Sequence, residues 1–189
     1  MLPEPADIVR LLYPTRRAAA PTASPQTTPD DASPFMRLTE ILQPDCVKVP
    51  LEAREKLAAI AELVHLLARA HDMEAEQLLD AVWKREQTRT TGIGHGVAIP
   101  HGKTPLCESL CMAVGVAPEP IEFQAIDQKP VNLIILLASP EDQTGPHIQA
   151  LARVSKLLCE PEVRGQIQSA ASGEDLYQVI CDHDGKIDG

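Results

Sequence analysis

A nearly continuous apolar run occupies residues 131 to 138 and reads Val-Asn-Leu-Ile-Ile-Leu-Leu-Ala. Its longest unbroken part, Leu133 to Ala138, is far shorter than the roughly 18 residues that a membrane-spanning helix needs. A short apolar run that is rich in branched side chains favours a strand buried on both faces. The chain is therefore expected to build a sheet around this strand and to cover the sheet with helices.

Apolar residues recur at helical intervals in several other stretches. One stretch predicts an amphipathic helix over residues 52–70, and a second predicts a helix over 73–87 with Asp72 as its N-cap. A third helix is predicted to begin at about His147, because four residues at intervals of three or four share one face: His147, Leu151, Val154 and Leu158. Pro161 is predicted to open another short helix.

Shorter apolar runs predict additional strands at residues 47–49, 97–99, 110–116 and 121–123. The last two runs read as a hairpin that turns at Ala117-Pro118-Glu119-Pro120, whereas other strands are separated by helices. Before the first strand, residues 38–42 predict a short helix that Pro44 ends. Because both kinds of connection occur, the expected fold class is α/β, with a mixed β-sheet sandwiched between α-helices.

Residues 1–35 differ in composition from the rest of the chain. They hold seven of the seventeen prolines, with Ala, Thr, Ser and Asp between them, which is typical of a disordered Pro/Ala-rich extension. Globular patterning begins at Met36, which is either an alternative start of translation or the boundary of a dispensable arm. The sequence thus predicts one domain over residues 36–182 and a tail over 183–189.

Net charge and cysteine content limit the partners and the compartment. The formal net charge of -10 disfavours binding to nucleic acid or to an anionic membrane, and it favours a cationic protein partner. The five cysteines include no C-x-x-C pair and come without a signal peptide. This pattern indicates reduced thiols in the cytoplasm.

The stretch from residue 91 to 103, Thr-Gly-Ile-Gly-His-Gly-Val-Ala-Ile-Pro-His-Gly-Lys, contains four of the ten glycines. Gly92, Gly94 and Gly96 predict a loop whose backbone N–H groups meet an anion. A P-loop is excluded because the position five residues before Gly102 is a valine. A dinucleotide-binding fingerprint is excluded because the glycine spacing is G-x-G-x-G and the stretch continues into a strand.

Three residues are candidates for phosphate chemistry. Pro100 fixes the backbone before His101, and a neutral imidazole can accept a phosphoryl group without a metal. Arg85 ends a predicted helix, where its charge can be aimed at phosphate. His147 lies in the first turn of its predicted helix, where the helix dipole favours an anion. The ordinary alternatives are a solvated arginine and two histidines that only pack or cap.

Residues 36 to 181 resemble the enzyme IIA domains of the bacterial phosphoenolpyruvate-dependent sugar phosphotransferase system, of the fructose/mannitol/nitrogen-regulatory class. The most specific part of this resemblance is T-G-I-G-x-G-x-A-I-P-H-G, which ends at Gly102 and is similar to the active-site signature of that family. Arg85 stands sixteen residues before the signature histidine, as in the family, and His147 matches its H-x-x-x-L helix opening.

The resemblance implies that His101 receives a phosphoryl group from the phosphohistidine of an HPr-like carrier and passes it on. It implies supporting roles for Arg85 and His147, and a phosphate loop formed by Thr91, Gly92, Gly94, Gly96 and Gly102. No cofactor, metal ion or membrane insertion is implied. We expect a regulatory protein whose acceptor or partner is a IIB protein or a regulated target. The alternatives are a sugar-specific IIA subunit of a transporter and a partner-binding domain without phosphotransfer.

A metalloenzyme is the rival from another functional class. It would use His95, His101, Cys107 and Cys111 as zinc ligands, but their spacings match no common zinc site. His95 also occupies a variable position of the signature, from which it could contact the same phosphate as His101.

Overall fold

The computed structural model describes residues 36–187. The predicted extension over residues 1–35 lies outside the described residues, as do residues 188–189 of the predicted tail. The described elements follow one another in the order η1 (Leu38–Glu40), β1 (Leu42–Lys48), α2 (Lys56–Ala70), α3 (Ala75–Thr88), β2 (Gly92–Gly94), β3 (Val97–Ala98), β4 (His101–Lys103), β5 (Cys111–Ile121), β6 (Val131–Ser139), α4 (Thr144–Cys159), α5 (Pro161–Gln168) and α6 (Gly173–Asp184).

The strands form one mixed sheet in the order β1-β5-β6-β3-β2, and β4 also pairs with β6. β6 is antiparallel to β5 and parallel to both β3 and β4, which follow one another along its length. β3 lies beside Leu133 and Ile134, whereas β4 lies beside Leu137, Ala138 and Ser139. His101, the first residue of β4, therefore lies beside the carboxyl end of the central strand β6.

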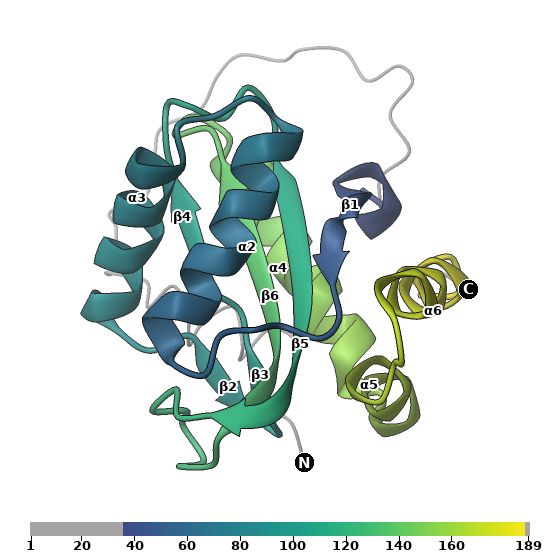
Figure 1. Cartoon of the computed structure of the whole chain (residues 1–189). Coiled ribbons are helices and arrows are strands. Elements are labelled where there is room, and N and C mark those ends of the chain that lie inside the picture. The colour runs from purple at the N-terminus through teal and green to yellow at the C-terminus, as the bar shows by residue number, and fades with distance from the viewer. Residues whose placement is uncertain (1–35, 188–189) are drawn as a thin grey trace, which may run out of the picture.

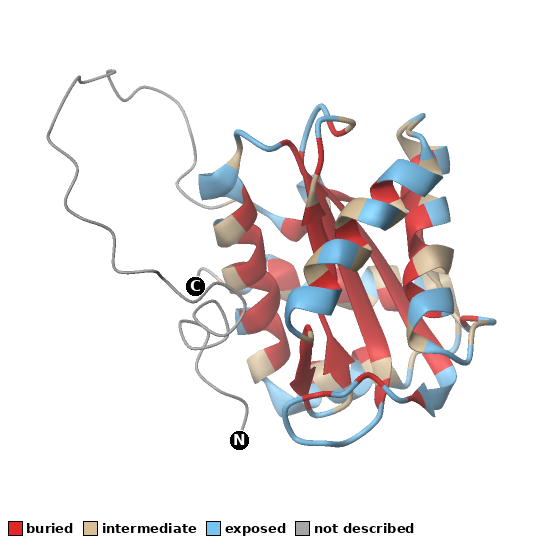
Figure 2. Cartoon of the chain, turned by 90° about the vertical axis from the view of Figure 1, so that its left-hand side faces the viewer, coloured by how far each residue is buried: buried red, intermediate tan, exposed pale blue. Residues whose placement is uncertain are grey.

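Helices cover both faces of the sheet, as the sequence predicted. α2 and α3 lie on one face, and α4 lies on the other (Figure 1). Figure 2 shows that the strands and the helix faces turned toward the sheet are mostly buried, whereas exposed residues lie mainly on the outer helix faces and loops. Apart from the half-buried Asn132, every residue of β6 is buried, as expected for a strand covered on both sides.

Three local predictions were wrong, and one of them concerns the strands. Residues 110–123 do not form a hairpin, because Cys111 to Ile121 make one long strand, β5, which pairs with β6 on one edge and with β1 on the other. The prolines at 118 and 120 lie where the pairing register shifts between Val116 and Ile121, and at such an irregularity a missing N–H donor is tolerated.

The other two wrong predictions concern a short helix at residues 38–42 and the N-cap of α3. Only Leu38–Glu40 form a 3-10 turn, and strand β1 begins at Leu42. Asp72 is not the N-cap of α3: it adopts a positive φ of 52°, and Glu74 occupies the cap position without a side-chain cap bond.

The buried carboxylate of Asp184 joins the two ends of the described domain and pairs with Arg153 of α4. Arg153 Nε donates to Asp184 Oδ1 at 2.5 Å, and Leu38 N donates to Asp184 Oδ2 at 2.9 Å. Asp184 therefore ties α4 and η1 to the end of α6. Within residues 36–187, no helix has the length and apolar character needed to cross a membrane.

Candidate functional site

His101 lies at the start of β4, and one of its two ring nitrogens is hydrogen-bonded to the backbone. It is 1% exposed, and Nδ1 lies 2.8 Å from the carbonyl oxygen of Ile99. A carbonyl can only accept, so Nδ1 must carry the proton and donate it. Nε2 therefore holds the lone pair, and it is the nitrogen that can act as a nucleophile.

The surroundings of His101 keep its imidazole neutral. Burial is the main cause that lowers its pKa from 6.5 to about 3, and the charge of Arg85 and the neighbouring His147 lower it further. The hydrogen bond to Ile99 acts in the opposite direction without reversing the effect. At neutral pH the nucleophilic lone pair is thus available without a general base.

His147 lies against His101. The ring centroids are 5.5 Å apart and the ring planes meet at 62°. His147 is fully buried in the first turn of α4, and its Nδ1 lies 2.7 Å from the Ser139 hydroxyl at the end of β6. Burial is again the main cause that lowers its pKa to about 4, followed by the charges of Lys103 and Arg85.

Two cations complete this site. Arg85, in the last turn of α3, donates from Nη1 to the carbonyl oxygen of Arg89 at 3.0 Å, and its charge acts on both histidines. Lys103 Nζ donates to Thr144 Oγ1 at 2.5 Å, which links β4 to the first residue of α4. The structure thus brings together His101, His147 and Arg85, the three predicted catalytic residues.

Lys103 and Ser139 belong to this site, but sequence reasoning missed both. The signal for Lys103 was available: alternate residues of a strand lie on the same face, so Lys103 shares a face with His101. Ser139 carried no local signal, because its place beside Lys103 and His147 depends on the pairing of β4 with β6 and on the position of α4.

Gly102 has a packing role that supports the site. A Cβ at this position would lie 3.1 Å from both the Val82 backbone nitrogen and Val82 Cγ2 on α3. The missing side chain lets α3 approach β4 closely, one turn before Arg85. This close approach is what positions the arginine beside His101.

The other predicted loop residues lie elsewhere. The carbonyl of Gly96 accepts from Leu133 N, whereas the carbonyl of Pro100 accepts from Leu137 N. These two points are four residues apart on β6, which corresponds to about 13 Å of strand. Gly96 is therefore not brought together with His101, and a phosphate-binding role for Gly92, Gly94 and Gly96 stays a prediction.

Local contacts explain why glycine occupies these three positions. Gly94 and Gly96 have positive φ values of 93° and 75°, and a Cβ at Gly92 would lie 2.8 Å from Ala125. Thr91 also has a structural contact, since its N–H donates to the buried carboxylate of Glu86 at 3.0 and 3.1 Å, and its predicted place in the phosphate loop stays a prediction.

His95 belongs to the same distant turn as these glycines. Its backbone N–H donates to Asp127 Oδ2 at 2.9 Å, and its carbonyl accepts from Gln168 Nε2 at 3.0 Å. Across residues 36–187, no three His, Cys, Asp or Glu side chains are grouped so that they could hold a metal ion. The zinc set that included His95 is therefore not assembled.

A cavity of about 430 Å³ adjoins the site. One wall comes from the loop after β4, including Pro105, Cys107 and Glu108, and the other is the 140–143 segment that leads into α4. Glu141 and Asp142 lie in that segment, so the cavity has an acidic rim. A basic protein surface would complement it.

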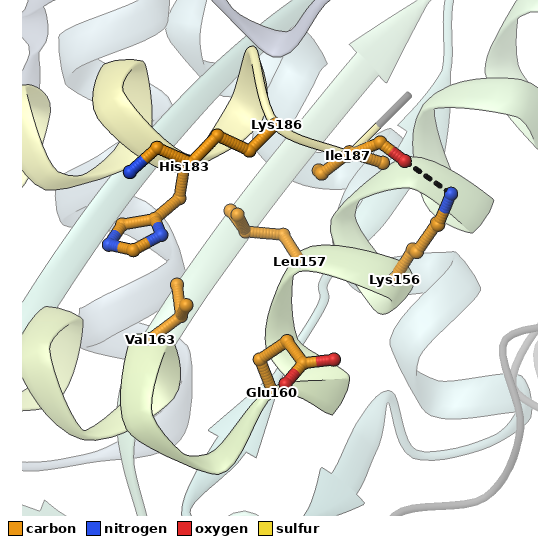
Figure 3. Close-up of a pocket in the computed structure, with 7 residues that line it drawn as sticks. All are labelled: Lys156, Leu157, Glu160, Val163, His183, Lys186 and Ile187. Carbon is orange, nitrogen blue, oxygen red and sulfur yellow. Dashed lines mark hydrogen bonds between the residues drawn. The ribbon is translucent and has the colours of Figure 1, made fainter. Parts of the chain in front are cut away.

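A second cavity, of about 340 Å³, lies between α4, α5 and the end of α6 (Figure 3). Figure 3 shows Leu157 and Val163 in its lining, and Lys156 Nζ donating to the carbonyl of Ile187 at 2.5 Å. None of the predicted site residues lines this cavity.

The fold and the site define a mixed-sheet α/β domain with a buried, neutral imidazole on which the charges of nearby cations act. Comparison with known proteins agrees: the family model "Phosphoenolpyruvate-dependent sugar phosphotransferase system, EIIA 2" matches residues 40–183. The nitrogen regulatory protein of Escherichia coli (strain K12) is 36% identical over 156 residues, which cover 81% of this chain and 94% of that protein.

Two further likenesses support the assignment. The fructose-specific EIIABC component of Bacillus subtilis is 33% identical over 150 residues, which cover 79% of this chain and 24% of that protein. The crystal structure of nitrogen regulatory protein IIA-Ntr from Neisseria meningitidis matches with a TM-score of 0.70 at 30% identity, covering 75% of this chain and 97% of that one. The chain belongs to the enzyme IIA type 2 family and is thereby a phosphotransferase-system component, which confirms the predicted resemblance.

Proposed function

We propose that this chain is a phosphohistidine carrier in which His101 Nε2 accepts a phosphoryl group from an HPr-like donor. The observation that carries the proposal is the buried, neutral His101 with Nδ1 donating to Ile99, set 5.5 Å from His147. This arrangement leaves one nitrogen as nucleophile and fixes the direction of its lone pair.

The transfer step is balanced without a cofactor. The N–P bond of the donor phosphohistidine breaks and a new N–P bond forms at His101 Nε2. The proton on Nδ1 remains in its hydrogen bond with Ile99 throughout. The phosphoryl group bears its negative charge on three oxygens in a loose transition state, so catalysis depends on positioning and on nearby positive charge.

Arg85, Lys103 and His147 supply that environment. The two cations already lower the pKa of His147, which shows that they act on this pocket. These cations disfavour a protonated, positively charged imidazole in the pocket. The same cations would attract an incoming dianionic phosphoryl group and stabilise it. Because His101 is 1% exposed, side chains above Nε2 must move when the donor docks.

The regulatory form of this function is favoured over transport. The 36% identity to a nitrogen regulatory protein extends over 94% of that relative, and the structure of IIA-Ntr from Neisseria meningitidis is matched over 97% of its length. The acceptor would then be a regulated target, and a separate IIB protein is the alternative. A domain that binds partners without phosphotransfer is the second alternative. We propose the cytoplasm as the compartment, in keeping with the free cysteines of residues 36–187.

The test is phosphorylation with purified components. Wild type, His101→Ala and His147→Ala are incubated with phosphoenolpyruvate, enzyme I and HPr, and intact mass is measured at mildly alkaline pH. We expect one added phosphoryl group, about 80 Da, in wild type, none in His101→Ala, and slow addition in His147→Ala. Addition to His101→Ala at the wild-type rate would overturn the proposal.

A further inference from the structure

The hydroxyl of Ser139 lies against one ring nitrogen of His147. Ser139 Oγ and His147 Nδ1 are 2.7 Å apart, and both residues are fully buried. Burial is the main cause that lowers the pKa of His147 to about 4, so at neutral pH only one of its two ring nitrogens carries a proton. The direction of the hydrogen bond with Ser139 decides which nitrogen that is.

The direction of this hydrogen bond follows from what a buried hydroxyl must satisfy. If His147 Nδ1 carried the proton, Ser139 Oγ would accept it, and the hydroxyl hydrogen would then have no acceptor among residues 36–187. A buried donor without an acceptor is costly, whereas a hydroxyl that donates to Nδ1 satisfies both groups. The hydroxyl therefore donates, and the neutral His147 ring carries its proton on Nε2.

His147 and His101 thus hold opposite tautomers. His101 Nδ1 donates to the carbonyl of Ile99, which leaves a lone pair on its Nε2. His147 Nδ1 accepts from Ser139, which leaves a hydrogen on its Nε2. Because the ring centroids are only 5.5 Å apart, a nucleophilic nitrogen and a hydrogen-bond donor belong to neighbouring rings of one site.

We propose that Ser139 is a positioning residue whose hydroxyl holds His147 in the Nε2–H tautomer, from which His147 donates a hydrogen bond to the phosphoryl group on His101. This role of Ser139 rests on the proposed function of His101. During transfer the N–P bond of the donor breaks, the N–P bond to His101 Nε2 forms, and His147 keeps its proton while it donates to a phosphoryl oxygen. A His147 ring in the other tautomer would present a lone pair to that anionic oxygen and repel it.

Both partners of the Ser139–His147 hydrogen bond are anchored to the β4 region. The carbonyl of Ser139 accepts from Thr104 N at 3.0 Å. Thr144, in the turn of α4 that carries His147, accepts from Lys103 Nζ at 2.5 Å. The hydroxyl and the ring are therefore in place before a phosphoryl group arrives, as a preorganised donor requires.

The first experiment determines the tautomers directly. The unphosphorylated chain is labelled with ¹⁵N-histidine, and long-range ¹H–¹⁵N spectra at neutral pH show which ring nitrogen carries each proton. In wild type we expect His147 to be protonated on Nε2 and His101 on Nδ1, and in Ser139→Ala we expect the Nε2–H population of His147 to fall. A wild-type His147 protonated on Nδ1, or an unchanged tautomer in Ser139→Ala, would overturn the proposal.

The second experiment measures the rate of phosphoryl acceptance from phosphorylated HPr by intact mass. Ser139→Ala should accept about tenfold more slowly than wild type, because His147 loses the contact that fixes its donor hydrogen. Ser155→Ala is the matched control: Ser155 is equally buried, but its hydroxyl donates to the carbonyl of Leu151 at 2.7 Å. We expect Ser155→Ala to accept at close to the wild-type rate.

A double variant separates an effect through His147 from any other effect. In a His147→Ala background, Ser139→Ala should cause no further slowing, since the ring on which the hydroxyl acts is absent. A further slowing there, a wild-type rate in Ser139→Ala, or equal slowing in Ser155→Ala would each overturn the role of Ser139 in transfer. If wild type accepts no phosphoryl group, the proposed function fails, while the tautomer spectra still decide whether Ser139 sets the His147 ring.

Discussion

His101 and His147 are stabilised in their neutral forms, which makes the stability of the chain depend on pH. Both have folded pKa values, about 3 and about 4, that lie below the ordinary value of 6.5. The unfolded chain therefore binds more protons below pH 6.5. The full contribution of both residues is present above that pH and is lost as pH falls towards the folded values.

We predict that the free energy of unfolding decreases by roughly 2 kcal/mol per buried histidine between about pH 6.5 and about pH 5. Urea unfolding at both pH values measures this for wild type and for a His101→Asn/His147→Asn variant. The other histidines and the carboxyl groups are common to both chains. The decrease in the free energy of unfolding between the two pH values should therefore be smaller in the variant, by about the sum of the two histidine contributions. An equal decrease in the two chains would refute this account.

Arg85 tests the electrostatic part of the site. Arg85→Ala should reduce the rate of phosphoryl acceptance by about a hundredfold, because a fixed cation near the transferred group is lost. Arg89→Ala is the matched control: it removes a nearby exposed arginine but keeps the backbone carbonyl that Arg85 contacts. Equal rates for Arg85→Ala and Arg89→Ala would show that Arg85 does not act on the phosphoryl group.

At the scale of elements, the contact between α3 and β4 sets the distance between Arg85 and His101. Gly102→Ala should push these elements apart, because the added methyl meets the backbone of Val82. We predict a loss of stability of about 1–3 kcal/mol and slower phosphoryl acceptance. Stability is measured by urea unfolding and acceptance by intact mass.

Gly165→Ala is the control for this substitution. Gly165 lies inside α5, and a Cβ there would meet no atom within 4 Å. Alanine at a helix position of this kind stabilises by about 0.5–1 kcal/mol relative to glycine. If both substitutions had the same effect, close packing at Gly102 could not be what positions α3.

The elements also show what the sequence could and could not predict. β6 was predictable because a continuous run of apolar residues is stable only in the buried interior. The place of His147 was predictable because apolar residues recur at regular helical intervals after it. The hairpin at residues 117–120 failed because prolines that suggest a turn were accommodated at an irregular part of β5. The place of the loop glycines could not be predicted for a related reason: the positive φ values of Gly94 and Gly96 agree with the sequence, but which end of β6 they lie beside depends on non-local pairing.

At the scale of the whole molecule, Asp184 connects the two ends of the domain. The predicted domain ended at residue 182, yet Asp184 accepts hydrogen bonds from Arg153 and from the backbone of Leu38. We therefore propose a domain that includes the last turn of α6. Sequence alone could not indicate this, because an ion pair across 31 residues leaves no local pattern.

Asp184→Ala should lower the free energy of unfolding by about 3–5 kcal/mol, since it leaves the cation of Arg153 buried without its counter-charge. Glu119→Ala is the control, because its ion pair with Arg54 is exposed, with side chains 68% and 78% accessible. We expect Glu119→Ala to lower the free energy of unfolding by less than about 1 kcal/mol. Comparable losses in the two variants, measured by urea unfolding, would contradict the account of Asp184.

The central claim is that His101 Nε2 carries the phosphoryl group, and isotope-edited NMR tests it most directly. The chain is labelled with ¹⁵N-histidine, phosphorylated through phosphoenolpyruvate, enzyme I and HPr, and examined for phosphorus–nitrogen coupling. We predict one phosphorylated ring, that of His101, coupled through Nε2 while Nδ1 keeps its proton. A phosphoryl group on His101 Nδ1, on His147 or on no histidine would contradict the account.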